Sequence, residues 1–416
     1  MPFLKRKTWG YDCIRIIYLS YYYLPHVGGG TWSTYHLSLQ LSKRGHFVQL
    51  IVPNIKHKLS VPREYSLSMQ KRNLSKVHRT PVLLIPRKLG PLLSGIFVFC
   101  SGLRFGKGVD IIVSQYHPHH LLSVIAVLLG RILKVPVVLR ADDVYREMGI
   151  EHLGLINRLI KVMNAFNEYF IRYADILLVV CSEAKEILRS RLRVGSQNYR
   201  IGLSYNGVDL SEFDNTPSKF DTREALDIGL DDKVLLFIGR YSGEEYGIQV
   251  LLRALPAIVK RKPNTLLILV GDELTPRQQS LYDSLGVHRN TRTYGPKPHE
   301  EIIKFIATAD LCIGPLMPTL AIPLKVLDYM ACGKPVLTGV KSISKDLALN
   351  DSNCLIVPPD SKTVAGMVTK LLQDEDYARR LGANARKIAT NFSWNKIATD
   401  LERLLVMVIV ERRSRR

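Results

Sequence analysis

The most constraining feature of this chain is a strand–turn–helix–strand pattern that occurs twice, over residues 14–52 and again over residues 234–270. In each copy an apolar strand leads through a glycine-rich turn to a helix with apolar residues at helical spacing, and a second apolar strand follows. The expected elements are strands 14–20 and 47–52 around helix 31–44, and strands 234–238 and 265–270 around helix 248–261. This order builds a parallel sheet, so the two copies predict two doubly wound α/β domains.

Further apolar strands extend both predicted sheets. They are expected at 110–114, 135–139 and 176–180 in the first half, and at 311–314, 335–338 and 355–357 in the second. The turn-rich segment 203–218 separates the halves and predicts an N-terminal domain over 1–203 and a C-terminal domain over 204–393. A last helix, at 394–410, runs into the basic sequence ERRSRR, and we expect the segment 394–416 to pack back on the first domain.

Composition sets the class of protein and of partner. Of the 416 residues 46% are hydrophobic and 23% are charged, which excludes disordered and fibrous chains. The formal charge of +21 is uneven, because residues 1–200 hold 29 Lys and Arg against 11 Asp and Glu. The first half therefore predicts an anionic partner: a phospholipid surface, a phosphorylated substrate or nucleic acid. No helix-turn-helix or aromatic–basic RNA signature is visible, so nucleic acid is not favoured.

Cysteine usage and hydropathy bear on location. The six cysteines include no C-x-x-C pair, so neither a zinc site nor a disulfide framework is indicated, as is usual in a reducing cytoplasm. The start of the chain is basic without the apolar run of a signal peptide, and no segment offers 18 clean apolar residues. We therefore expect a cytoplasmic protein that does not span a membrane.

The first glycine turn is a candidate binding site. Gly28, Gly29 and Gly30 come just before a helix, whose free backbone N–H groups and positive end suit a phosphate or a sugar. A plain tight turn would use the same residues, and that reading stays open. The spacing is not G-x-G-x-x-G, so a dinucleotide is not favoured.

The second half offers cations and a carboxylate. Arg240 directly follows a strand, where a guanidinium is well placed for a diphosphate, although an ordinary surface arginine is the alternative. Lys325 begins the helix of IPLKVLDYMACGKPVL, and Asp328 follows one turn later on the same face. A lysine opposes the dipole at a helix start, which makes sense if an anion is held there. Asp328 can accept hydrogen bonds from ribose hydroxyls; an i,i+3 salt bridge with Lys325 is the alternative.

Taken together, these motifs resemble glycosyltransferase family 4 of the GT-B fold. The quoted residues are Gly28-Gly29, Arg44-Gly45-His46, Asn206-Gly207-Val208-Asp209, Gly239-Arg240 and PLKVLDYMACGKPV. The resemblance covers residues 14–400 in order. It implies two Rossmann-like domains that face a central cleft, and transfer of a sugar from a nucleotide-sugar, generally with retention and without a metal or other cofactor.

The resemblance also implies roles for single residues. Gly28 and Gly29 fall where the family approaches the donor diphosphate or its sugar, Arg240 falls where the diphosphate is held, and Asp328 where a glutamate binds ribose. The implied donor-binding set is Gly28, Gly29, Gly30, Arg240, Gly271, Tyr294, Gly295, Lys325 and Asp328.

Three positions depart from the family pattern. Tyr246 stands where a lysine is expected, Leu320 replaces the first glutamate of E-x7-E, and Asp142 replaces a histidine. The lost lysine removes a cation from the departing diphosphate, and Lys325 is positioned to compensate. The expected catalytic residues are Arg240, Lys325 and Asp142.

The acceptor side of the first domain offers acidic and imidazole groups. Asp142 and Asp143 follow the end of a strand, where they are placed to orient the acceptor hydroxyl or the donor sugar. The alternative is structural: one of them caps the start of a helix and the other is an exposed neighbour. His117, His119 and His120 follow another strand without a nearby carboxylate, so they do not predict a metal site. Either one of these histidines lines the cleft, or all three are ordinary loop residues.

The apolar segment 89–103 bears on membrane association. It is flanked by Arg87, Lys88, Arg104 and Lys107 in a strongly basic domain, so it indicates either docking on an anionic lipid surface or a buried helix.

The sequence therefore predicts a glycosyltransferase that moves a sugar from a UDP- or GDP-sugar to a lipid-linked or surface-glycan acceptor. We expect it to be peripheral on the inner face of the membrane. The losses at Tyr246 and Leu320 motivate the alternative of an inactive protein that binds sugar nucleotide or scaffolds an active partner. The oligomeric state stays open.

Overall fold

The structure is a computed structural model, and the chain divides into two compact units. It describes residues 13–26, 28–54, 62–81, 90–117, 121–142, 162, 165–191, 200–239, 247–317, 322–339, 346–347 and 349–415. Unit 1 comprises Met1–Tyr205 and Trp394–Arg416, and unit 2 comprises Asn206–Ser393. The junction lies two residues from the one that the turn-rich segment indicated.

Unit 1 is built on a seven-stranded parallel sheet with the order β3-β2-β1-β4-β5-β6-β7. The strands are β1 (Arg15–Leu19), β2 (Phe47–Pro53), β3 (Lys76–Thr80), β4 (Ile111–Tyr116), β5 (Val137–Ala141), β6 (Ile176–Val179) and β7 (Ile201–Leu203). The central strands are buried on both faces, which explains their continuous apolar sequences. The order changes direction between β1 and β4, and ligands of such sheets bind at this switch point.

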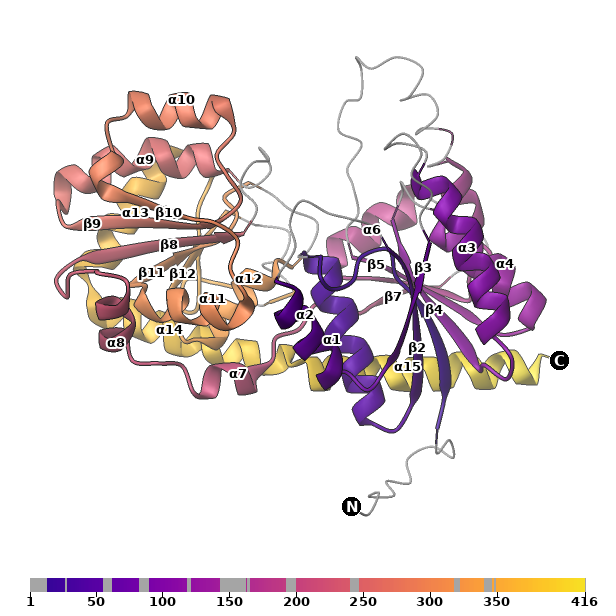
Figure 1. Ribbon diagram of the computed structural model, residues 1–416. Helices are drawn as coiled ribbons and strands as arrows, with labels where there is room; N and C mark the ends of the chain where they lie inside the picture. Colours follow the sequence, from indigo (N-terminus) through magenta and orange to yellow (C-terminus); the bar gives the residue numbers. More distant parts are fainter. Residues whose placement is uncertain are drawn as a thin grey trace. The chain divides into compact units, whose positions relative to one another are not determined.

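Helices cover both faces of this sheet, with α1 on one face and α3 and α4 on the other (Figure 1). They are α1 (Gly29–Lys43), α2 (Arg63–Arg72), α3 (Gly90–Phe105), α4 (Leu122–Leu133), α6 (Ser182–Arg191) and α15 (Trp394–Ser414). The last of these packs against α1: Arg44 forms an ion pair with Glu402 (3.0 Å), and His36 stacks on Trp394. The C-terminal helix thus belongs to unit 1.

Unit 2 repeats the architecture with a six-stranded parallel sheet in the order β10-β9-β8-β11-β12-β13. Its strands are β8 (Lys233–Gly239), β9 (Thr265–Gly271), β10 (Thr291–Tyr294), β11 (Leu311–Ile313), β12 (Val336–Thr338) and β13 (Leu355–Ile356). Its helices are α7 (Leu210–Asp214), α8 (Lys219–Ala225), α9 (Ile248–Arg261), α10 (Pro276–Ser284), α11 (His299–Thr308), α12 (Leu324–Ala331), α13 (Ser361–Gln373) and α14 (Glu375–Ala389). In Figure 1, α9 and α13 lie on one face of the sheet, and α11 and α14 on the other.

Three strands were not expected from the sequence: β3, β7 and β10. Each lies at an edge of its sheet, where one side has no neighbouring strand. Their sequences, KVHRT, IGL and TRTY, are short or polar because an edge strand is only partly buried. Hydrophobic periodicity therefore does not reveal them.

The apolar segment 89–103 forms most of α3. Glycines within α3 and directly after it let α3 approach α4 closely, because a Cβ at Gly102 would lie 2.4 Å from Leu129 and one at Gly106 would lie 2.5 Å from Leu133. Val98 is buried, whereas Ile96 is 58% exposed, so the helix has one packed face and one apolar outer face. Among the described residues, no helix has the length and apolar character needed to cross a bilayer.

Candidate functional site

The carboxyl edge of the unit 2 sheet has bare backbone at its centre. β8 and β9 end side by side at Gly239 and Gly271, which are paired in register. Gly271 has a φ of +146°, and a Cβ there would lie 2.1 Å from the Gly239 carbonyl oxygen. Gly239 has a φ of +108°, which also favours glycine. A bulky ligand can therefore come close to the main chain at this edge.

Lys325 places a cation at the same edge. It lies in the first turn of α12, its Nζ atom is buried, and the ammonium group sits 4.4 Å from the centre of the Phe237 ring. A Cβ at Gly239 would lie 3.0 Å from Nζ, so the glycine makes room for this side chain. Arg240, the next residue along the chain, lies outside the described residues, as do Tyr246 and Leu320.

Asp328 lies one turn along α12, with its side chain 16% exposed. Burial, and secondarily the charge of Glu212, raises the pKa of this carboxyl well above its usual range. Its Oδ2 atom lies 3.9 Å from Nε2 of His299. A partly buried carboxylate of this kind is stabilised by any ligand that donates hydrogen bonds to its charged form.

His299 joins the site although no sequence pattern singled it out. It begins α11, and its Nδ1 atom lies 3.6 Å from Oε2 of Glu212, so the ring stands between Glu212 and Asp328. Burial lowers the pKa of His299 to about 4, and Asp209 opposes that shift. The imidazole is therefore neutral at physiological pH. The proline-rich turn before α11 indicates in the sequence that a helix begins there, but it does not indicate which residues of other elements lie against His299.

The Asn206–Asp209 motif organises this neighbourhood. Asn206 donates from Nδ2 to the carbonyl oxygen of Ile322 (2.9 Å), just before α12. Asp209 caps α7, accepting from the backbone N–H of Ser211 (3.2 Å), and α7 carries Glu212. The motif thus links the residue that precedes α12 to the helix that faces His299.

The third strand end at this edge belongs to β10. Tyr294 is its last residue, and its ring packs on Phe305 with ring centres 4.8 Å apart. At Gly295 no atom lies within 4 Å of a built Cβ, so the backbone there is open. The structure therefore brings Gly239, Gly271 and Tyr294 together, at the ends of three adjacent strands.

The carboxyl edge of unit 1 is organised around Gln115, which sequence reasoning missed. Its Nε2 atom donates to the carbonyl oxygen of Gly30 and to Oδ2 of Asp142 (both 3.0 Å). Its Oε1 atom accepts from Oγ of Ser20 (2.7 Å) and from the backbone N–H of Tyr21 (3.2 Å). Gln115 therefore ties the ends of β1, β4 and β5 to the start of α1.

Asp142 is held by the groups of unit 1 itself. It forms an ion pair with Arg140, a fully buried residue whose pKa is lowered by burial, and its Oδ1 atom accepts from Oγ of Ser33 (3.1 Å). With Gln115 on its other oxygen, Asp142 has partners at both carboxylate atoms. The carboxylate therefore anchors the first turn of α1.

The remaining unit 1 candidates are placed only in part. A Cβ at Gly28 would lie 3.4 Å from Nε2 of His26, and one at Gly29 would meet nothing within 4 Å, so the α1 start is open there. The ring of His117 lies 6.2 Å from that of Tyr22. Asp143, His119 and His120 lie outside the described residues. Within the described part of the chain, no three His, Cys, Asp or Glu side chains are grouped to hold a metal ion.

Two parallel-sheet units with polar groups at their carboxyl edges are the architecture of the GT-B class, and comparison with known families identifies the chain with that class. The family described as "Glycosyltransferase Family 4" matches residues 27–212, and "Glycosyl transferases group 1" matches residues 218–388. The chain belongs to these glycosyltransferases, which confirms the predicted family and fold.

Individual relatives have low sequence identity to this chain, but their alignments cover most of its length. A D-inositol 3-phosphate glycosyltransferase of Corynebacterium jeikeium is 27% identical over 336 residues, which is 77% of each chain. An uncharacterized glycosyltransferase of Methanocaldococcus jannaschii is 25% identical over 331 residues, 71% of this chain and 79% of the relative.

Solved structures share the fold. A sucrose-phosphate synthase from Thermosynechococcus elongatus matches with a TM-score of 0.74 at 19% identity, over 96% of this chain and 100% of the other. HepE of Anabaena, in complex with UDP-glucose, matches with a TM-score of 0.73 at 17% identity, over 94% and 99%.

Proposed function

We propose that this glycosyltransferase moves a sugar from a UDP- or GDP-sugar to a lipid-linked or surface-glycan acceptor. We further propose that it retains the anomeric configuration, needs no metal and works at the cytoplasmic face of the membrane. The observation that carries the proposal is the grouping of Lys325, Asp328 and the bare backbone of Gly239 and Gly271 at one sheet edge.

The diphosphate of the donor fits the centre of this edge. The Lys325 ammonium beside Gly239 would neutralise the charge that develops on the leaving nucleoside diphosphate, and Arg240 follows directly in the chain. The cations of Lys325 and Arg240 would supply the charge stabilisation that a bound metal provides in other enzymes, which supports transfer without a metal. Gly28, Gly29 and Gly30, at the open start of α1, are proposed to approach the diphosphate or the sugar.

The nucleoside fits the flank of the edge. Asp328 would accept hydrogen bonds from the two ribose hydroxyls, which favour its ionised form and so compensate for its burial. The open backbone at Tyr294 and Gly295 would meet the base. The HepE structure that shares this fold holds UDP-glucose, which supports a nucleotide-sugar as the donor.

The acceptor is assigned to unit 1. Its positive charge suits an anionic or lipid-linked acceptor, and the corynebacterial relatives carry a phosphorylated molecule, D-inositol 3-phosphate, in their names. His117, His119 and Asp143 are the proposed acceptor-side residues. The contacts of Asp142 favour a positioning role through the first turn of α1.

The test is a thermal-shift series on the full chain with UDP, GDP, ADP and CMP. A nucleotide at 100 times its Kd stabilises the folded chain by about 2.7 kcal/mol, a shift of a few degrees in Tm. Asp328→Ala is expected to abolish the shift, whereas Asp376→Ala, a matched change at a 76% exposed carboxylate of unit 2, keeps it. No shift with any nucleotide would overturn the donor site.

Turnover separates the proposal from its alternative. The purified chain is incubated with the sugar conjugate of the nucleotide that binds, with and without EDTA, and the product is analysed by NMR for anomeric configuration. Transfer with retention in EDTA supports the proposal. Nucleotide binding without transfer to any acceptor would instead support an inactive scaffold, as the losses at Tyr246 and Leu320 suggest.

A further inference from the structure

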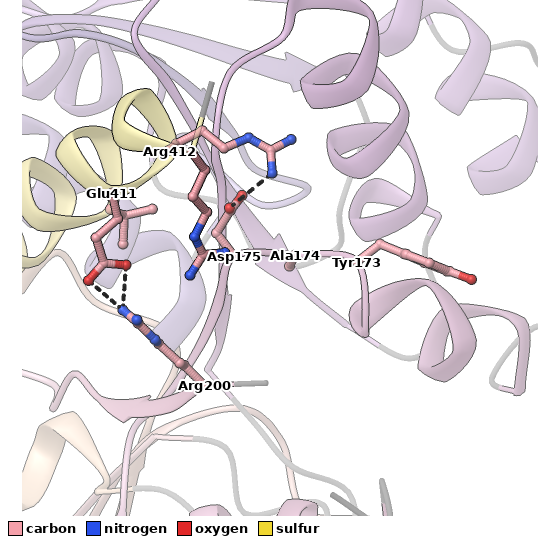
Figure 2. Close-up of a pocket in the computed structure, with 8 residues that line it drawn as sticks. Tyr173, Ala174, Asp175, Arg200, Glu411 and Arg412 are labelled. Atoms are coloured by element: carbon pink, nitrogen blue, oxygen red, sulfur yellow. Dashed lines mark hydrogen bonds and ion pairs between the residues drawn. The ribbon is translucent and has the colours of Figure 1, made fainter. Parts of the chain in front are cut away.

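Unit 1 has a second cluster of charged groups, at the opposite edge of its sheet from Asp142. A cavity of about 270 Å³ is lined by Arg131, Lys134, Arg412 and Arg415, from the ends of α4 and α15. Two of these residues also line an adjoining cavity of about 140 Å³ (Figure 2). The second cavity is lined by Tyr173, Ala174, Asp175, Arg200, Val408, Glu411, Arg412 and Arg415. We call the two cavities together the basic groove.

The basic groove has more cations than its own carboxylates can balance. Arg200 donates from Nη1 to both oxygens of Glu411 (2.9 and 2.7 Å), as Figure 2 shows. Asp175 accepts from the backbone N–H of Val137 (2.8 Å) and lies 3.7 Å from Arg412. Against these two carboxylates stand five lining cations, so three positive charges in the groove have no carboxylate among the lining residues. Such an arrangement is stabilised by a bound anion.

Lys134 occupies its place in the groove at a conformational cost. It ends α4 with a φ of +58° and a ψ of +39°, the left-handed conformation that glycine usually supplies at helix ends. A lysine there is disfavoured relative to glycine, and such strain is concentrated at functional positions. The strained backbone at Lys134 therefore favours a role for its ammonium group in the groove.

Exposed apolar side chains of α4, the helix that supplies Arg131, and the exposed ring of Tyr173, a lining residue, accompany the cations of the groove. Leu128 and Ile132 of α4 are 37% and 56% exposed, and Tyr173 is 44% exposed. The guanidinium of Arg131 lies 4.4 Å from the centre of the Tyr173 ring, so a cation that lines one cavity contacts an aromatic ring that lines the other. Tyrosine rings with polar tips are enriched at membrane–water interfaces, where one end is apolar and the other is wet.

We propose that the basic groove binds the phosphate of an anionic phospholipid headgroup, with Leu128, Ile132 and Tyr173 at the lipid interface. The inference deepens the membrane association proposed above by naming its face and its ligand. A soluble phosphate shares the charge chemistry but gains nothing from the exposed apolar side chains of α4, whereas a lipid bilayer offers both a phosphate and an apolar phase. The site lies at the amino edge of the sheet and is separate from the residues assigned to sugar transfer.

The test is flotation of the full chain with phosphatidylcholine vesicles that contain or lack phosphatidylglycerol. The triple variant Arg131→Gln, Lys134→Gly and Arg415→Gln is compared with a control that removes three exposed cations of α2: Arg63→Gln, Lys71→Gln and Arg72→Gln. Each cation removed from the groove is expected to lower partitioning onto the anionic vesicles about five-fold, while the control stays near wild type.

Lys134→Gly alone guards against misfolding. Glycine relieves the left-handed backbone, so this variant is expected to keep or raise Tm while it lowers vesicle partitioning about five-fold. An unchanged partition for the triple variant, or an equal loss in the α2 control, would overturn the proposal. The proposal would also be overturned if the chain bound inorganic pyrophosphate or a random DNA duplex but did not bind the vesicles.

The vesicle assay is independent of donor chemistry. Asp328→Ala is expected to float like wild type, and the triple groove variant is expected to keep its nucleotide-induced shift in Tm. Failure of the donor site would therefore leave the flotation result intact, and failure of the groove would leave the nucleotide result intact.

Discussion

The carboxyl edges of the two sheets share one architecture but differ in how their polar groups are satisfied. In unit 1, Asp142 is paired with Arg140 and accepts hydrogen bonds from Ser33 and Gln115. In unit 2, Asp328 faces His299 across 3.9 Å, and its pKa lies well above the usual range. The charge of Asp142 is balanced by a cation and hydrogen-bond donors of the fold itself, whereas the charge of Asp328 is not.

This difference separates scaffold from binding site. Asp142 and Asp328 are about equally exposed, at 15% and 16%, so burial does not distinguish them. A carboxylate with a buried guanidinium and two neutral donors as partners holds secondary structure in place, and any ligand would have to displace those partners. A partly buried carboxylate with a raised pKa gains stability from a ligand that donates to it. A charged residue near a strand end is therefore not necessarily a ligand contact. The decisive property is whether other groups of the fold already balance its charge and fill its hydrogen-bonding positions.

The largest effect is expected from Arg140→Met, which leaves the partly buried Asp142 without its cation. Breaking one side of a buried ion pair costs about 3–5 kcal/mol of the free energy of unfolding. Urea unfolding of the full chain measures it, and Asp142→Asn added to Arg140→Met is expected to restore much of the loss. If Asp142→Asn alone kept full stability and abolished turnover, Asp142 would contact substrate, and unit 1 would resemble unit 2.

The next effect is on turnover. Lys325→Met removes the ammonium group beside Gly239, and we expect kcat to fall about 100- to 1,000-fold, the usual cost of losing one group that stabilises developing charge. Lys362→Met, at an exposed lysine of α13, is the control. Stability should hold in both variants. An equal kcat for Lys325→Met and the control would place the leaving-group charge elsewhere.

Asp328→Asn tests the incomplete carboxylate itself. Losing a charged acceptor of ribose hydroxyls is expected to raise the Kd for the nucleotide about 10- to 100-fold, measured by calorimetry. Because burial disfavours the charged form, the same change should leave the free energy of unfolding equal or higher. A large loss of stability would instead show that Asp328, like Asp142, is a structural partner.

The smallest effect concerns His299 and pH. Unfolded histidine binds a proton near pH 6.5 and this folded one only near pH 4, so the unfolded chain holds more protons between those values. Stability due to His299 is therefore lost as pH falls, by about 1 kcal/mol between about pH 7.5 and about pH 5.5. Asp328, with a raised pKa, contributes with the opposite sign, so both measurements use an Asp328→Asn background.

The matched comparison adds His299→Gln to that background. Urea unfolding at the two pH values should show the pH-dependent loss in the parent and a smaller loss in the His299→Gln variant. Glu212 and Asp209 face the ring in both proteins and so cancel in the comparison. Identical pH dependence in the two would mean that the His299 pKa is not lowered by folding.

Local pattern identified the core elements well. The helix expected at 248–261 is α9, with the same bounds, and the buried central strands lie within two residues of expectation. Long apolar runs and helical spacing of apolar residues follow directly from burial, so the elements that they predict are found in the structure. The edge strands β3, β7 and β10 were missed because partial burial leaves no such pattern.

For the site, sequence alone placed Lys325 and Asp328 one turn apart on a helix, because their spacing and the helix start are local properties. It also placed glycines at strand ends where the backbone stays bare. These features, with the family resemblance, were enough to identify a two-domain glycosyltransferase.

Tertiary structure alone decided which groups meet across the chain. The Arg140–Asp142 pair gains Gln115 from another strand, His299 comes between Glu212 and Asp328, and the ends of α4 and α15 form the basic groove. These contacts join residues tens to hundreds of positions apart. Burial and mutual distance set the pKa and the availability of each group, and neither quantity is a property of a residue's neighbours in sequence.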